Sequence, residues 1–159
     1  MKICNQCLYP NTHPLGITLN STGVCSGCDV HEEKYNQGWE DRKKDLLKIV
    51  NDYKINRIDE YDCVVPINGG SDSFYTVYYV KEILGLKPLC VYYNTLYSTR
   101  LGHSNLSRLR RLFNIDIHIH IPSREQIIAI NKATIYHLQS MYWHVHAGST
   151  SYPLHIAKR

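Results

Sequence analysis

The chain has 159 residues, 43% hydrophobic and 20% charged, which excludes a disordered chain and fits one ordinary domain with a small appendage. Its formal net charge of +4 allows an anionic substrate such as a nucleotide, but falls short of the basicity typical of proteins that bind nucleic acids. No apolar stretch is long enough to span a membrane, and the amino terminus lacks the apolar run of a signal peptide. We therefore expect a cytoplasmic protein, in which thiols stay reduced and do not form disulfides.

Two cysteine pairs, Cys4-x-x-Cys7 and Cys25-x-x-Cys28, stand out in residues 1–30. The segment is rich in turn-forming residues and has almost no helical periodicity, so it cannot build a core of its own. Each pair can present two thiolates to one tetrahedral ion, and the intervening loop lets the pairs meet. We predict a structural zinc site with a closed coordination sphere. The alternatives are two redox-active dithiols or chance spacing.

Residues 31–60 are predicted to form a connecting segment with an amphipathic helix over residues 39–53. One stripe of this helix carries large side chains, and the opposite side carries charged ones. The stripe comprises Trp39, Leu46, Val50 and Tyr53, and the charged side comprises Asp41, Lys44 and Lys48.

Residues 61–159 alternate between apolar runs and helical patterns, which predicts an α/β fold with a Rossmann-like parallel sheet and helices on both faces. Three strands are predicted, over residues 62–67, 88–93 and 115–121. The first should be buried on both faces, and the third should have one polar face. The predicted helices are residues 73–84 with Gly85 as an αL cap, a segment around 106–113, a helix opened by a capping box at Ser123 and running to about 139, and a short one near 153–158. Ligands of such sheets bind at the carboxyl ends of the strands.

A polar turn, residues 68–73, lies at such a position, between the first predicted strand and a helix. Gly69 and Gly70 permit close backbone approach, and their amides, together with the helix N-terminus, can cradle phosphate oxygens. Ser71 and Ser73 can add hydroxyl donors, and Asp72 can orient Mg²⁺. The alternative is a plain strand-to-helix connection with Asp72 or Ser73 as the N-cap. The turn matches neither the P-loop nor the dinucleotide-binding pattern.

The segment Pro66-Ile67-Asn68-Gly69-Gly70-Ser71-Asp72-Ser73 resembles the Ser-Gly-Gly-x-Asp-Ser pyrophosphate loop of the PP-loop ATP pyrophosphatases, which have the adenine nucleotide alpha-hydrolase-like fold. The layout as a whole is similar to that of the N-acetyl sugar amidotransferases. The similarity rests on the leading cysteine pairs, Trp39, residues 61–66 and 81–89, and the later Trp143, His146, Gly148 and Pro153. On this resemblance, residues 61–159 are a PP-loop ATP-binding domain.

The resemblance implies an enzyme that uses ATP to adenylate the amide oxygen of the N-acetyl group on a nucleotide-linked sugar. Ammonia from a glutaminase partner would then displace AMP, in the biosynthesis of surface polysaccharide or flagellar glycan. The implied pyrophosphate-binding residues are Asn68, Gly69, Gly70, Ser71 and Ser73, with Asp72 near Mg²⁺, Tyr93-Asn94 near the adenine and His146 at the substrate.

Three departures from the family pattern accompany this resemblance. Asn68 replaces the loop's first serine, and Ser71 replaces the lysine usual in this subfamily, a loss for which Arg100 could compensate. Family members also continue beyond the segment that ends this chain, which implies an N-terminal fragment. Two other functions therefore stay open: a tRNA-modifying enzyme of the thiolase type, and an inactive, zinc-stabilised nucleotide-binding or docking fragment.

Several other residues have simpler interpretations. His13 is a spare zinc ligand or, preferably, a surface residue, and Cys63 and Cys90 are expected to be buried small hydrophobes. His118 and His120 share one strand face, which we expect to be solvated rather than metal-binding, and His144 is expected at the surface. Three arginines predict a solvated helix face, with a phosphate or RNA contact as the alternative: Arg108, Arg110 and Arg111.

Overall fold

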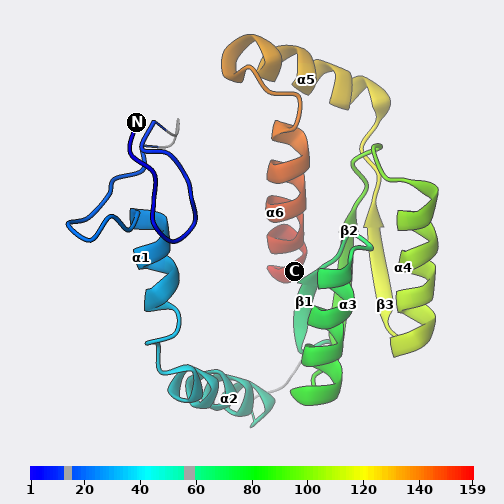
Figure 1. Ribbon diagram of the computed structural model, residues 1–159. Coiled ribbons are helices and arrows are strands. Elements are labelled where there is room, and N and C mark those ends of the chain that lie inside the picture. Colours follow the sequence, from blue (N-terminus) through cyan, green and yellow to red (C-terminus); the bar gives the residue numbers. More distant parts are fainter. Residues whose placement is uncertain (13–15, 56–59) are drawn as a thin grey trace. The chain divides into compact units, whose positions relative to one another are not determined.

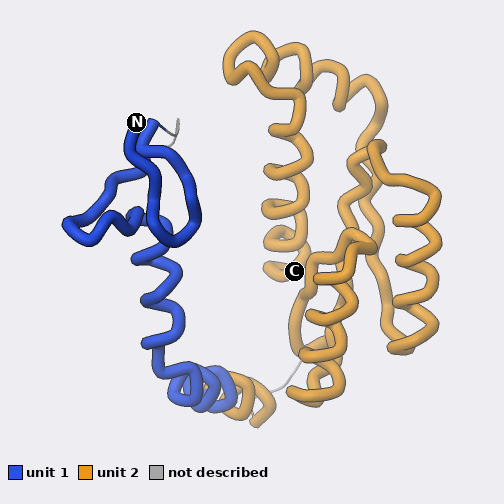
Figure 2. The backbone as a smooth tube through the Cα atoms, in the orientation of Figure 1, with its two compact units in different colours: residues 1–48 blue, residues 49–159 orange. Residues whose placement is uncertain are grey.

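The computed structural model describes residues 1–12, 16–55 and 60–159 of the chain. These form two compact units, residues 1–48 and 49–159 (Figure 2). The elements in chain order are α1 Ser26–Glu33, α2 Trp39–Ile55, β1 Cys63–Pro66, α3 Ser71–Tyr78, the π-helix η1 Tyr79–Ile83, β2 Pro88–Tyr93, α4 Arg100–Phe113, β3 Asp116–His120, α5 Arg124–Leu138 and α6 Trp143–Ala157 (Figure 1). Among the described residues, no helix is both long enough and apolar enough to cross a membrane.

The first unit contains little regular structure. Two isolated antiparallel bridges, Ile3 with Pro10 and Leu19 with Cys25, fold its chain into loops ahead of α1. Among its described residues, the buried side chains are the thiols Cys4 and Cys25, whereas the large apolar side chains stay exposed. The unit therefore lacks an ordinary hydrophobic core, as its sequence predicted.

Helix α2 begins at Trp39, as predicted, and runs to Ile55, so that the boundary between the two units falls inside it. Val50 is the buried residue of the predicted apolar stripe, and it packs with Leu84 and Leu86 inside the second unit, to which it belongs. Lys54 of the same unit donates a hydrogen bond from its Nζ to the Leu84 carbonyl at 2.7 Å. The rest of the stripe is partly exposed: Trp39, Leu46 and Tyr53.

The second unit is built on a three-stranded parallel sheet with the order β1-β2-β3. The register pairs Val65 with Cys90 and Cys90 with Ile117. The predicted parallel sheet is confirmed. The predicted burial of the first strand on both faces is wrong in part, since Cys63 is half-buried and Pro66 is exposed.

Helices lie on both faces of this sheet, as predicted (Figure 1). Helices α3 and α4 cover one face and enclose the main core, formed by Val65, Ile67, Val77, Cys90, Tyr92, Leu106, Leu109 and Ile115. Helix α6 covers the other face along β1 and β2. The approach of α6 is close: a Cβ added to Gly148 would lie 2.3 Å from the Tyr93 ring. This glycine lets α6 rest directly on the sheet.

The helix ends follow local sequence signals where these exist. Ser123 and Gln126 form the predicted capping box at the start of α5, and Gly85 has the predicted positive φ, +62°. The helix predicted over residues 73–84 instead starts at Ser71 and ends in the π-helix η1. The helix predicted near residue 153 starts ten residues earlier, at Trp143, and passes through Pro153. Pro153 is buried in this helix, which lies along β1, and such burial of apolar surface offsets the backbone hydrogen bond that a proline cannot make.

Candidate functional site

The four predicted zinc ligands come together in the first unit. Cys4 Sγ lies 4.0 Å from Cys28 Sγ, and Cys7 Sγ lies 3.5 Å from Cys25 Sγ. All four sulfur atoms lie within 4.8 Å of one another. A tetrahedral zinc ion with Zn–S bonds of about 2.3 Å requires sulfur separations of about 3.8 Å, so these thiols can hold a metal ion such as zinc.

Backbone amides point at the sulfur of Cys4. The amides of Gln6 and Cys25 donate to Cys4 Sγ at 3.4 and 3.3 Å. Hydrogen bonds from the Cys7 backbone and these amides lower the pKa of Cys4 to about 6, whereas burial is the main cause that raises the pKa of Cys28 to about 12. Four neighbouring thiols cannot all ionise without a cation between them, and metal binding removes this restriction.

The histidines considered as metal ligands do not form a second centre. His118 Nε2 lies 2.9 Å from the Tyr152 hydroxyl, and the His120 ring stacks on Tyr152 at 4.2 Å between centroids. The predicted solvated face is therefore partly covered by a side chain of α6. Over residues 1–12, 16–55 and 60–159, no other group of three or more potential ligands has metal-binding geometry. His13 lies outside these residues.

The glycine-rich turn connects β1 to α3 at the carboxyl end of the sheet. Gly70 is the N-cap of α3 and Ser71 its first residue, so Asp72 and Ser73 are not the N-cap, while a plain strand-to-helix connection stays open. Asn68 closes the turn, because its Oδ1 accepts hydrogen bonds from the Gly70 amide and the Ser73 hydroxyl, both at 2.9 Å. The Asn68 side chain thus already satisfies one of the amides that a phosphate would use.

Helix α4 fixes the shape of this turn from the side. Gly69 has φ of +79°, and a Cβ at this position would lie 2.6 Å from the Gly102 carbonyl oxygen. Asn105 Nδ2 donates to the Gly69 carbonyl at 3.0 Å. Close packing against α4 therefore requires a glycine at position 69, independently of any bound ligand.

A cavity of about 190 Å³ opens between the turn, the end of β2 and α6. Its lining residues are Pro66, Ile67, Asn68, Asp72, Ser73, Thr76, Val91, Tyr93 and Ser149. The structure thus brings Asn68, Asp72, Ser73 and Tyr93 together. Thr76 and Ser149 also line this cavity and were not predicted. Thr76 lies one helical turn beyond Asp72 and could have been found from that spacing, whereas nothing in the local sequence marks Ser149.

A second hollow of about 310 Å³ lies on the α4 side of the turn, lined by Asn68, Gly69, Gly70, Ser98, Thr99, Leu101, Gly102 and Asn105. Thr99 is the N-cap of α4 and accepts a hydrogen bond from the Gly102 amide. Exposed Arg100 is the first residue of this helix. Two helix N-termini therefore lie on either side of residues 69–70, and their dipoles favour negative charge there.

The remaining predicted site residues lie apart from this cavity lining. Asn94 follows β2, and its Oδ1 accepts from the Leu96 amide at 2.9 Å, which shapes the turn there. His146 is exposed on α6, one turn before Ser149. The predicted surface position of His144 is wrong: its side chain is buried, with Nδ1 3.0 Å from Asn131 Oδ1. The early start of α6 turns this residue inward.

Two further cysteines and an arginine cluster lie outside the site. Cys90 is fully buried, as predicted, while Cys63 is only partly buried. The arginines Arg108, Arg110 and Arg111 are exposed on α4, which agrees with a solvated helix face.

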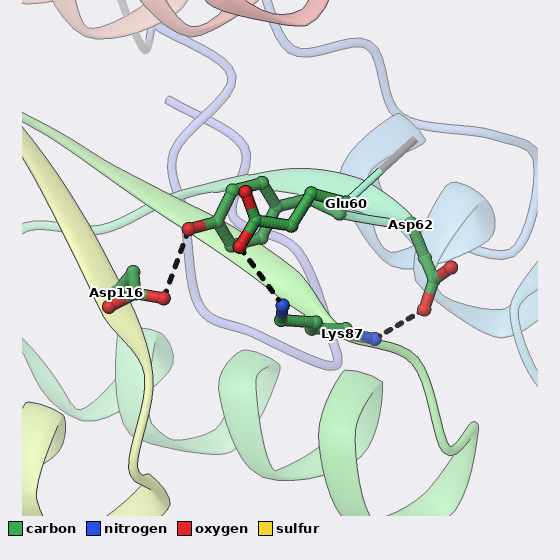
Figure 3. Close-up of polar contacts among 5 residues, drawn as sticks. Glu60, Asp62, Lys87 and Asp116 are labelled. Atoms are coloured by element: carbon green, nitrogen blue, oxygen red, sulfur yellow. Dashed lines mark hydrogen bonds and ion pairs between the residues drawn. The ribbon is translucent and has the colours of Figure 1, made fainter. Parts of the chain in front are cut away.

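The opposite, amino end of the sheet carries polar contacts with a structural role (Figure 3). The Tyr61 hydroxyl donates to Asp116 Oδ2 at 3.0 Å, and this bond raises the pKa of Tyr61. Lys87 bonds twice, through its Nζ to Glu60 at 3.3 Å and through its backbone amide to Asp62 at 2.6 Å. These contacts join the segment that enters β1 to the starts of β2 and β3.

The chain is weakly related to a known protein. No protein-family model matches the chain. The chain is 25% identical over 116 residues to the uncharacterized protein MJ1599 of Methanocaldococcus jannaschii. The match covers 73% of this chain and 41% of that protein, so the chain spans less than half of its relative's length.

Proposed function

We propose that the second unit binds ATP, with the phosphates at the turn of residues 68–73. The cavity beside this turn carries the proposal, since it lies at the carboxyl end of parallel strands and combines hydroxyls, a carboxylate and an aromatic ring. The amides at the start of α3 supply donors for phosphate oxygens. Asp72, which lines this cavity, would hold Mg²⁺, and the ion would neutralise phosphate charge.

We further propose that the reaction is an ATP-dependent amidotransfer, which rests on the resemblance to the N-acetyl sugar amidotransferases. The amide oxygen of the N-acetyl group would attack the α-phosphorus of ATP and release pyrophosphate. Ammonia from a glutaminase partner would then attack the activated carbon, and AMP would leave as the acetamidino group forms. This order suits an unreactive amide, because adenylation supplies a good leaving group.

The chain's residues would have separate parts in this reaction. Residues 69–73 would bind pyrophosphate through backbone amides and hydroxyls, and Tyr93 and Asn94 would border the adenine. His146, exposed on α6, would meet the sugar substrate. The zinc site has no part in the chemistry and serves to order the first unit.

Asn68 provides a sharp test, because its side chain competes with phosphate for the Gly70 amide. We expect Asn68→Ser to tighten binding of ATP with Mg²⁺ about fivefold, the value of roughly one hydrogen bond. Ser71→Lys should also tighten binding, and Asp72→Asn should weaken it. Isothermal titration calorimetry measures these changes, with Asn51→Ser on the exposed side of α2 as the matched control. ATP affinity that none of the three substitutions changes would contradict the proposed site.

The reaction itself is tested by pyrophosphate release. We expect release from ATP that depends on both an ammonium salt and a nucleotide-linked N-acetyl sugar. The hydrogen bond between Asn68 and the Gly70 amide also favours a second candidate, a zinc-stabilised docking fragment that binds no nucleotide. Absence of ATP binding in the wild type, Asn68→Ser and Ser71→Lys would support that second candidate and exclude the enzyme.

A further inference from the structure

Strand β3 forms one edge of the described sheet and pairs with β2 alone. The His120 carbonyl accepts a hydrogen bond from the Asn94 amide, on the β2 side. Because backbone groups alternate along a strand, those of Ile117 and Ile119 point to the open edge. Ile119 is 52% exposed, and Ile121 just beyond the strand is 63% exposed. An open edge with apolar side chains is a template for pairing with another strand.

The sequence of this edge is complementary to itself in the antiparallel direction. A two-fold axis at His118 places Asp116 of one copy opposite His120 of the other, and Ile117 opposite Ile119. Ile121 of one copy would lie opposite Ile115 of the other, which is buried in the core of its own unit. The pairing therefore matches an acidic with a basic side chain and apolar with apolar ones. The backbone agrees too, since Ile117 and Ile119 are the residues whose amides and carbonyls are free to exchange hydrogen bonds across the axis.

We propose that the protein forms a homodimer through antiparallel pairing of two β3 strands, which joins both sheets into one. The groove beside β3 supports this partner, because it lies on the α4 face of the sheet, where the isoleucines of both copies would meet. It has a volume of about 380 Å³ and is lined by Leu106, Ser107, Arg110, Asp116, Ile117 and Ile119. The pairing leaves the turn of residues 68–73 free, and it does not depend on the proposed function.

Sedimentation velocity over a range of protein concentrations tests the dimer. Ile119→Lys places a charge at the edge and should raise the dissociation constant of the dimer about tenfold or more. Ile83→Lys is the matched control, because Ile83 is 50% exposed and belongs to η1 rather than to the edge strand. Circular dichroism confirms that both variants fold. A wild-type chain that stays monomeric, or a dimer that Ile119→Lys leaves unchanged, overturns the proposal.

Disulfide trapping tests the register. In the proposed pairing, His118 faces its own copy, so the cysteines of His118→Cys should form an intermolecular disulfide on mild oxidation of the zinc-loaded protein. His120→Cys is the control, since position 120 faces position 116 and lies about four residues away from its own copy. Equal cross-linking of the two variants, or none in either, would contradict this register.

Discussion

The two units of this chain differ in the kind of side chain that each one buries. In residues 1–48 the buried side chains among the described residues are thiols that can converge on one ion. In residues 49–159 aliphatic and aromatic side chains between the sheet and its helices form the core. A metal ion held by these thiols would order the first unit through coordination bonds, whereas removal of apolar surface from water orders the second.

This difference teaches how a short segment can be ordered without a core. Binding of a structural zinc ion contributes on the order of 10–16 kcal/mol in small zinc domains. Burial of one large apolar side chain contributes only about 1.5–3 kcal/mol, so many are needed to order a unit. The first unit has too few such side chains inside, and its stability should depend on metal, while that of the second should not.

Removal of the metal should have the largest effect. We expect a strong chelator, or Cys25→Ser, to abolish the structure of residues 1–48 and leave the second unit folded, because the thiolates are the main buried contacts of the first unit. Amide chemical shifts from NMR can follow both units in one sample. If Cys25→Ser left the metal content and the structure of the first unit unchanged, the contrast between the units would be wrong.

The converse substitution lies in the core of the second unit. Leu109 is fully buried among the residues that α3 and α4 pack against the sheet. Leu109→Ala should lower the free energy of unfolding of this unit by about 2–5 kcal/mol through loss of burial and creation of a cavity. Urea denaturation measures the loss, and Leu101→Ala, at a 70% exposed position on the same helix, is the control. Metal affinity should not change in either variant.

A smaller effect should appear at alkaline pH. Burial raises the pKa of Cys90 from 9.0 to about 12, so between these values the unfolded chain releases a proton that the folded chain keeps. The free energy of unfolding should therefore fall as pH rises above 9, by at most about 1.4 kcal/mol per pH unit for this group. Denaturation at several pH values measures the slope. Cys90→Ala should make it shallower, and an unchanged slope would contradict the assignment to Cys90.

Those parts of the fold with a local signal could be predicted from the sequence. The strand at Pro88–Tyr93, the capping box at Ser123 and the αL glycine at Gly85 are examples, because a few neighbouring residues determine each of them. The extent of α6 could not be predicted in this way. It contains Pro153, a usual helix breaker, yet the helix continues through this residue, which is buried.

The features of the candidate sites also separate into those with a local sequence signal and those that only the three-dimensional structure reveals. Cysteine spacing alone predicted the thiol cluster, because two Cys-x-x-Cys pairs in one short segment are typical of four ligands around a single metal ion. The turn of residues 68–73 was recognised, but its bond from Asn68 to the Gly70 amide needed three-dimensional structure. Ser149 and buried His144 belong to a helix remote in sequence, and no pattern around them indicates which side faces inward.

The packing of Gly69 against α4 has a consequence for the entropy of binding. The Asn105 side chain and the Gly102 backbone hold the turn in one conformation before any ligand arrives. A ligand that enters such a rigid cradle loses less free energy to ordering of the chain than one that must first arrange a mobile loop. The turn would thus be a preorganised binding site. The rate of ligand binding would depend on how easily the ligand reaches the turn and not on a conformational change of the chain.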